Sequence, residues 1–329
     1  MIEASAPARA GVIGNPTDGY GGSMIACSLG LRATARISPC DRIELTFGGE
    51  ETAITDEKDL LLDGGVLDIP KSVIRYLRIA DQKFRLEGLS DIPFRSGLAG
   101  STAMLTATFG AVATHIGLRL NPYQMAETIR YIELNYMDIQ CGYQDQYMSV
   151  FGGLNYLDFR TKEFYRELHE EAFATVEPLA QYVDKLPFVL VHTGVQRISG
   201  SILRPVRERW LDGDPAVVEG YREIAELARA GKKALICSDW ERLGELMNRN
   251  HEIQKALGAS GKINDTFIEL ALARGALGAK LAGAGGGGTI IALHFEPEVL
   301  IEAFKKKGDH LVISLDPQPG LQIKEIPST

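Results

Sequence analysis

The sequence has no cysteine pair at the spacing of a metal or redox motif. Its four cysteines, Cys27, Cys40, Cys141 and Cys237, are far apart, and no C-x-x-C is present. Zinc ribbons and thioredoxin-like sites therefore have little support, and we expect four reduced thiols in a cytosolic protein.

Long apolar runs and basic stretches are also missing. No apolar run approaches the roughly 20 residues that a helix needs to span a bilayer, and the start, MIEASAPARAG, lacks the basic and apolar regions of a secretory signal. We therefore expect a cytoplasmic protein that has no membrane partner. The formal net charge is −8, and without a basic stretch this argues against nucleic acid as a partner.

No internal repeat or low-complexity linker divides the chain. Its 329 residues suggest about two domains, and a composition of 45% hydrophobic and 24% charged residues is typical of a globular protein. After the apolar run LPFVLVHTG the pattern changes to long stretches of helical periodicity. We place the boundary near 180–190, which gives two predicted domains, 1–185 and 186–329.

Local patterns predict several elements. Residues 32–49 alternate as two strands of a hairpin would. Residues 101–117 are rich in Ala, Thr and Gly and predict a buried helix. Asn121 and Pro122 have the residue types of an N-cap and a first turn, and Asn264 is the expected N-cap of a later helix.

Five glycines stand within residues 283–288, at Gly283 and 285–288, and include the spacing G-x-G-x-x-G. Dinucleotide binding requires a strand, the glycine loop and then a helix. Here a helix is expected before the loop and a strand after it, so the spacing does not indicate an NAD site. A plain turn would use one or two glycines for positive φ. Five leave bare backbone that a ligand or another chain segment can approach closely.

Two further glycine-rich loops precede this glycine loop. The first loop, residues 7–22, fits P-x-R-x-x-x-x-G-x-x-x-D-Y at Pro7, Arg9, Gly14 and Asp18, with Gly19 inserted before Tyr20. The second loop, residues 92–103, fits P-x-x-x-G-L-x-S-S-A at Pro93, Gly97, Leu98, Ser101 and Ala103; Gly100 replaces the first serine and Thr102 precedes the alanine. In this order and separation the three loops resemble the motifs of the GHMP kinases, named for galactokinase, homoserine kinase, mevalonate kinase and phosphomevalonate kinase.

The resemblance implies an α+β protein with the two-domain GHMP kinase fold, in which a ribosomal-S5-like N-terminal domain precedes a ferredoxin-like C-terminal domain. It implies ATP and Mg²⁺ as cofactors. A glycine loop that opens a helix suits a phosphate, because free backbone N–H groups and the helix dipole favour an anion. We expect ATP to contact Gly97, Leu98, Ala99, Gly100, Ser101 and Thr102, although Ser101 has the residue type of a simple N-cap as well.

The resemblance also assigns the reacting groups. The G-x-x-D-Q run at 142–146 implies that Asp145 is the base or orienting group for the acceptor hydroxyl, and that Arg9 pairs with Asp145 and the transferring phosphoryl group. Glu133 and Ser101 are the expected Mg²⁺ ligands, with Asp138 as an alternative to Glu133. Spacing alone would leave Glu133 as a solvated helix acid and Arg9 as a surface charge.

The acceptor is read from two further stretches. GNPTDGYGG resembles the branch that includes both glucuronokinase and the heptose-phosphate kinases. Within this branch, the block 206–254 resembles glucuronokinase, whereas GYQDQYMSVFGG resembles the heptose-phosphate kinases. We predict a sugar-1-kinase that converts D-glucuronate to its 1-phosphate with ATP. The alternatives are a D-glycero-D-manno-heptose 7-phosphate kinase or another sugar-1-kinase, and a non-catalytic sugar- or nucleotide-binding protein.

The expected substrate is a small sugar or sugar acid, bound by a monomer or homodimer. Asp18 would hold sugar hydroxyls, and Arg197 is the candidate partner for a carboxylate because the guanidinium fork matches its geometry. The full set of predicted substrate contacts is Asp18, Gly19, Tyr20, Arg197, Gly285 and Gly286.

Overall fold

The computed structural model describes residues 1–162, 170–195, 199–285 and 288–327. The strands are β1 (Ile2–Ile13), β2 (Ser23–Ser38), β3 (Ile43–Phe47), β4 (Glu50–Ile54), β5 (Arg85–Ser90), β6 (Leu154–Asp158), β7 (Thr175–Pro178), β8 (Phe188–His192), β9 (Gly278–Leu281), β10 (Thr289–Leu293), β11 (Val312–Ser314) and β12 (Gln322–Glu325). The helices are α1 (Asp68–Leu77), α2 (Gly100–His115), α3 (Pro122–Asn135), α4 (Gln144–Phe151), α5 (Ser199–Leu211), α6 (Pro215–Ile236), α7 (Trp240–Ala256), α8 (Lys262–Ala273) and α9 (Pro297–Lys305). This α+β content confirms the predicted class.

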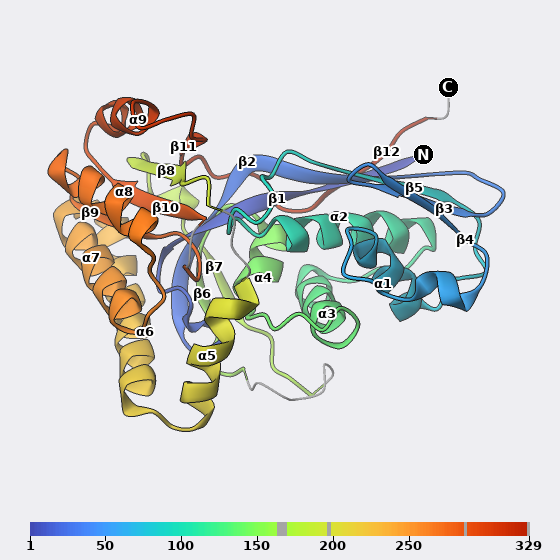
Figure 1. The fold of residues 1–329 in the computed structure, drawn as a ribbon, viewed down its shortest axis with the longest axis horizontal. Coiled ribbons are helices and arrows are strands. Elements are labelled where there is room, and N and C mark those ends of the chain that lie inside the picture. Colours follow the sequence, from blue (N-terminus) through green and yellow to red (C-terminus); the bar gives the residue numbers. More distant parts are fainter. Residues whose placement is uncertain (163–169, 196–198, 286–287, 328–329) are drawn as a thin grey trace.

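The first sheet is built around the long strand β2. Its order is β12-β1-β2-β5-β3-β4, and β6 also pairs with β2 and carries β7. One half of β2 pairs with β6 and the other half with β5. The helices α1 to α4 lie together on one side of this sheet (Figure 1). The buried helix α2 contacts β1 and β2, as the small side chains of its sequence predict.

The predicted hairpin at 32–49 is wrong. β2 and β3 form as strands, but β5 lies between them, because β3 pairs in parallel with β5 and antiparallel with β4. Alternation identifies a strand and its buried face, and it carries no information about the neighbouring strand.

The second sheet has the order β11-β8-β10-β9, and all its pairings are antiparallel. Helices α8 and α9 contact this sheet, and α7 and α6 stand beside it in Figure 1. Its core contains Val189, Val191, Leu281, Ile290 and Phe304, all fully buried. A second hydrophobic core is thus enclosed outside the first sheet. The helical periodicity that follows residue 185 in the sequence belongs to α5, α6 and α7.

The last strand returns to the first sheet. β12 pairs with β1, with Ile2 opposite Glu325, and the segment before it crosses the C-terminal end of α4. Ser28 Oγ donates a 2.6 Å hydrogen bond to the Gln318 carbonyl, and Gly152 forms a bridge with Pro319. The chain therefore links the two sheets twice, before β8 and after β11.

Helix starts follow the sequence in one case and depart from it in another. The Asn121 side chain accepts from the Gln124 N–H at 2.9 Å and Pro122 is the first residue of α3, which confirms the predicted N-cap. The prediction for Asn264 is wrong, because the N-cap of α8 is Gly261 and Asn264 lies one turn inside the helix, fully buried.

Candidate active site

One cavity of 1510 Å³ joins the three loops. Its walls come from the first loop, the second loop, the α3–α4 connection, the start of the glycine loop, and the turns around Gly48 and Gly64. Arg207 of α5 also lines it. Segments that are far apart in the sequence thus surround one space large enough for a nucleotide and a small acceptor.

Arg9 and Asp145 form an ion pair in this cavity. Arg9 is buried in β1, and its Nε donates a 2.7 Å hydrogen bond to Asp145 Oδ1. Its Nη1 donates to the Gly97 carbonyl at 2.8 Å, so the same guanidinium contacts the second loop. Asp145 stands in the first turn of α4 and its side chain is 31% exposed. The pair therefore offers the cavity a carboxylate whose position is fixed by a buried cation.

The second loop leads directly into α2. Ala99 and Gly97 adopt left-handed backbone conformations with φ of 63° and 79°, and α2 begins at Gly100. No side chain caps this helix, and Ser101 is already its second residue, so the N-cap reading of Ser101 is wrong. The exposed Ser101 lines the cavity together with Gly97, Ala99, Gly100 and Thr102, whereas Leu98 is buried. An uncapped start of a 16-residue helix is suited to bind an anion.

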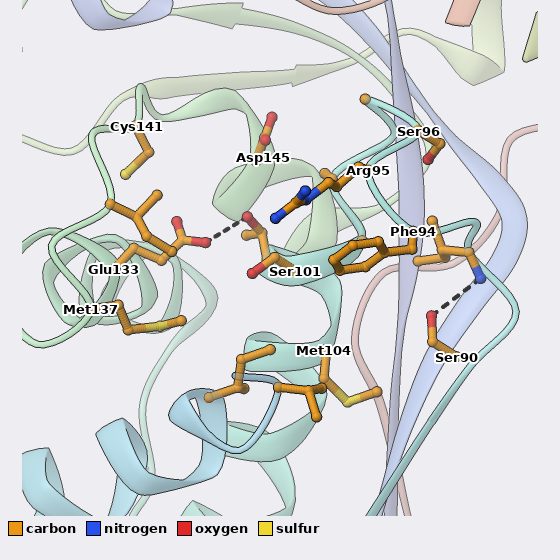
Figure 2. Close-up of a pocket in the computed structure, with 18 of the residues that line it drawn as sticks. Ser90, Phe94, Arg95, Ser96, Ser101, Met104, Glu133, Met137, Cys141 and Asp145 are labelled. Carbon is orange, nitrogen blue, oxygen red and sulfur yellow. Dashed lines mark hydrogen bonds between the residues drawn. The ribbon is translucent and has the colours of Figure 1, made fainter. Parts of the chain in front are cut away.

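Glu133 is a buried carboxylate at the cavity wall. Thr102 Oγ1 donates a 2.6 Å hydrogen bond to its Oε1, and Gln146 Nε2 donates to Oε2. Burial raises the pKa of Glu133 to about 7, against the hydrogen bonds from Thr102 and Gln146. Figure 2 shows Glu133, Ser101 and Arg95 pointing toward one another, and the dashed line from Glu133 marks the bond to Thr102. Asp138 is exposed and is not part of the cavity lining.

The residues fit an Mg²⁺ ion that arrives with a nucleotide. The described residues contain no group of three His, Cys, Asp or Glu side chains that could hold a metal. In enzymes that act on nucleotide triphosphates, Mg²⁺ is commonly bound by one or two protein carboxylates and by substrate phosphates. The Glu133 carboxylate and the Ser101 hydroxyl both line the cavity and would supply such oxygens, although burial opposes the ionisation of Glu133. The ion would neutralise negative charge on the phosphates.

Asp18 contacts the start of the helix that carries Asp145. Its Oδ2 accepts hydrogen bonds from the backbone N–H groups of Tyr143 at 2.8 Å and Gln144 at 2.9 Å. Burial raises the pKa of Asp18, and these two N–H groups oppose that rise. Asp18, Gly19 and Tyr20 all line the cavity. Asp18 thus supports α4 with one oxygen while it stands in the wall of the cavity.

The glycine loop connects two antiparallel strands. The expectation of a helix before the loop is wrong: β9 precedes it and β10, which pairs with β9, follows it. A loop between two strands offers no helix N-terminus to a pyrophosphate. The topology therefore argues against an NAD site more strongly than the expected order of helix, loop and strand did.

The glycine loop contacts the cavity, the second loop and a neighbouring turn. Gly283 and Ala284 line the cavity. A Cβ on Gly288 would lie 2.5 Å from the Ser96 carbonyl oxygen. A Cβ on Gly285 would overlap with the carbonyl oxygen of Ala259. Gly285 therefore packs against other backbone beside the cavity.

Two predicted contacts, Arg197 and Gly286, lie outside the described residues. The structure instead brings Arg207 to the cavity, where its Nη1 donates to the Gln140 side chain. A single arginine in a helical pattern gives no signal of the direction in which it points. Arg95 also lines the cavity, with its guanidinium carbon 4.9 Å from the centre of the Phe94 ring.

Comparison with known proteins places this geometry in a family. A profile described as GHMP kinases N terminal domain matches residues 68–153, and one described as GHMP kinases C terminal matches residues 224–310. The mevalonate kinase of Pyrococcus furiosus is 30% identical over an alignment of 348 positions, which covers 99% of this chain and 99% of the relative. The chain belongs to the GHMP kinase family.

Other relatives differ in the substrates that they are named for. Probable glucuronokinase 2 of Arabidopsis thaliana is 29% identical to this GHMP kinase over 311 residues, 85% of this chain and 81% of the relative. The solved D-glycero-D-manno-heptose 1-phosphate kinase of Bacteroides thetaiotaomicron superposes with a TM-score of 0.75 at 22% identity and covers all of both chains. The two-domain α+β GHMP kinase fold is therefore confirmed, and the protein is a phosphotransferase of a family that uses ATP. No helix among the described residues has the length and apolar character needed to cross a membrane.

Proposed function

We propose that this GHMP kinase transfers the γ-phosphoryl group of ATP to the anomeric hydroxyl of a sugar acid, with D-glucuronate as the acceptor. The observation that carries the proposal is the ion pair between the buried Arg9 and the partly exposed Asp145, which lies in one cavity with the second loop and Arg207. Glucuronokinases are among the relatives that match most of the chain, and the block 206–254 that resembles them includes the end of α5 with Arg207.

The reaction needs a base and a fixed phosphate chain. The anomeric oxygen attacks the γ-phosphorus while the bond to the bridging oxygen of ADP breaks. The hydroxyl proton passes to Asp145 and then to water, so the products are the sugar 1-phosphate, ADP and a proton. The guanidinium of Arg9 keeps Asp145 in place and offsets charge on the transferring group. ATP would lie against the second loop, and Mg²⁺ would be held by Glu133 and Ser101.

An acidic acceptor requires a cation on the acceptor side of the cavity. Arg207 has this position, because it contacts Gln140 in the segment that leads to Asp145. It also lies on the same helix as Trp210, whose ring centre is 5.1 Å from that of Tyr20 in the first loop. We assign to Arg207 the carboxylate contact that the sequence predicted for Arg197. Asp18, with a second carboxylate oxygen, remains the proposed partner of sugar hydroxyls.

Mevalonate is the second candidate acceptor, since mevalonate kinases match 99% of this chain at comparable identity. Mevalonate is also a carboxylic acid with a hydroxyl, so Arg207 would serve either molecule. The resemblance of residues 206–254 to glucuronokinase favours the sugar acid.

The test is ADP release with Mg-ATP over a panel of acceptors: glucuronate, galacturonate, glucose, galactose, mevalonate and a heptose 7-phosphate. We expect turnover with glucuronate, and we expect this turnover to disappear in Asp145→Ala. In Arg207→Met, the KM for glucuronate should rise while the turnover of neutral hexoses does not fall. Turnover with mevalonate or a heptose phosphate but not with glucuronate would assign a different acceptor. ATP binding without turnover of any acceptor would indicate a binding protein.

A further inference from the structure

Lys280 is a fully buried cation that the proposed reaction does not use. It lies in β9, three residues before the glycine loop, and none of its surface is exposed. Its Nζ donates to Asn15 Oδ1 at 2.6 Å and to the Leu281 carbonyl at 2.6 Å. No carboxylate among the described residues pairs with it. A buried charge without a counter-ion destabilises a fold, so its presence calls for a function.

The side chain that Lys280 holds connects the first loop to the glycine loop. Asn15 lines the cavity, and its Nδ2 donates to the carbonyls of Gly283 at 2.8 Å and Leu281 at 3.3 Å. Because Lys280 occupies Asn15 Oδ1, the amide can present its Nδ2 only to those carbonyls. The buried Asn250 of α7 accepts from the Gly14 N–H at 2.9 Å and completes the junction. Lys280 thus determines how the first loop meets Gly283, which also lines the cavity.

The charge that acts on Lys280 is positive. Burial, together with the nearby charge of Arg9 of β1, lowers the pKa of Lys280 to about 7. From α7, His251 faces it, and burial and the charge of Lys280 lower the pKa of His251 to about 4. His251 in turn lies 3.6 Å from Asp265 of α8, which pairs with Lys255. Asp145 already pairs with Arg9, so the phosphates of a bound nucleotide would add the further negative charge that Lys280 lacks.

We propose that Lys280 is a positioning residue for phosphoryl transfer, which holds Asn15 across the glycine loop and adds a buried positive charge behind Arg9 that stabilises the nucleotide's phosphates. The charge and the hydrogen bonds act together: the ammonium group fixes the loop when the phosphates are present. This role depends on phosphoryl transfer and is independent of which acceptor the enzyme uses.

The variant Lys280→Met tests the charge with little change in shape. We expect its melting temperature to be unchanged or higher, since a buried charge is replaced by an apolar side chain of similar length, while kcat/KM for ATP falls by ~30-fold or more. The control is Lys71→Met in α1, which removes another nearly buried lysine that donates to a carbonyl, at Leu61, and which should keep kcat/KM. Parallel losses of stability and activity, or an unchanged kcat/KM, would overturn the proposal.

The pH profile gives a second readout. In the wild type, kcat/KM for ATP should fall as pH rises above about 7, where free Lys280 loses its proton, and kcat should fall only at higher pH because bound phosphates raise the pKa of Lys280. Lys280→Met should lack this alkaline limb. An alkaline limb that persists in the variant would contradict the assignment.

If Lys280→Met does not fold, the proposal can be tested on the wild-type protein. Titration calorimetry with a non-hydrolysable Mg-ATP analogue near pH 8.5, in two buffers of different ionisation enthalpy, measures protons taken up on binding. At this pH Glu133 is already ionised and contributes little. Uptake of a substantial fraction of a proton supports the proposal, and binding without proton uptake overturns it.

Discussion

Asp18 and Tyr143 are separated by 125 residues and are joined by a hydrogen bond of 2.8 Å from the Tyr143 N–H to Asp18 Oδ2. The carboxylate thus does for α4 what an N-cap does, although it comes from a distant loop. Asp145, two residues further on, has its position set by this contact as well as by Arg9. The first loop therefore contributes to the geometry of the candidate base.

Replacing Asp18 should separate support of α4 from contact with the acceptor. We expect Asp18→Ala to lower kcat at least tenfold and to destabilise the fold by about 1 kcal/mol, as the loss of a helix cap does. Asp18→Asn keeps an acceptor oxygen and should recover most of the stability. Denaturant unfolding and steady-state kinetics measure both effects. A rise in the acceptor KM with unchanged kcat and stability would show that Asp18 contacts only the acceptor.

Arg9 should not tolerate replacement by lysine. Its guanidinium reaches Asp145 and the Gly97 carbonyl at once, and an ammonium group cannot reproduce that fork. We expect Arg9→Lys to lower kcat on the order of 100-fold with a smaller change in KM for ATP. The control, Arg42→Lys, alters an exposed arginine paired with Glu44 and should leave kcat unchanged. Near-normal kcat in Arg9→Lys would remove Arg9 from the transition-state contacts.

Glu133 should make the stability of the free enzyme depend on pH. Its pKa is about 7 in the fold and 4.5 when unperturbed, so the folded state holds a proton that the unfolded state releases. The free energy of unfolding should therefore fall as pH rises from about 4.5 to about 7, by roughly 3 kcal/mol at most. Glu133→Gln should lack this decrease.

Urea unfolding near pH 5 and pH 7.5 without nucleotide measures the difference between the two proteins. Saturating Mg-ATP should raise wild-type stability more at the higher pH, because a cation favours the ionised carboxylate. Equal pH slopes for wild type and Glu133→Gln would contradict the assignment.

A bulky residue at Gly285 should impair folding as well as turnover. The sequence predicts Gly285 as a substrate contact. The structure gives it a φ of 101°, and a Cβ added there would overlap with the Ala259 carbonyl. We now expect Gly285→Val to cost at least about 2 kcal/mol, because both strain and a backbone clash must be relieved. The control, Gly30→Ala, adds a Cβ in open space and should be nearly neutral. A fully stable and active Gly285→Val would contradict the structure here.

The sequence predicted those parts of the site that lie inside motifs. Arg9, Asp145 and the start of α2 are identified by the resemblance of their motifs to those of the GHMP kinases, and the structure brings them together. The pairing of the strands was not predictable, because the strand that lies between β2 and β3 is β5, which begins 47 residues after β2 ends. Arg207 and Lys280 were missed for a related reason: their positions depend on how one element packs on another. A buried lysine in a strand looks, in sequence, like an exposed one at the strand's polar face.

The return of β12 to β1 changes how the protein can be divided. The second sheet is, in topological terms, an insertion into the first, enclosed between β7 and β12 and tethered at both ends. A cut at residue 185 would leave the N-terminal part with an open edge at β1 and would remove the segment that braces the end of α4. Complete separation of the two halves is therefore opposed by two covalent crossings.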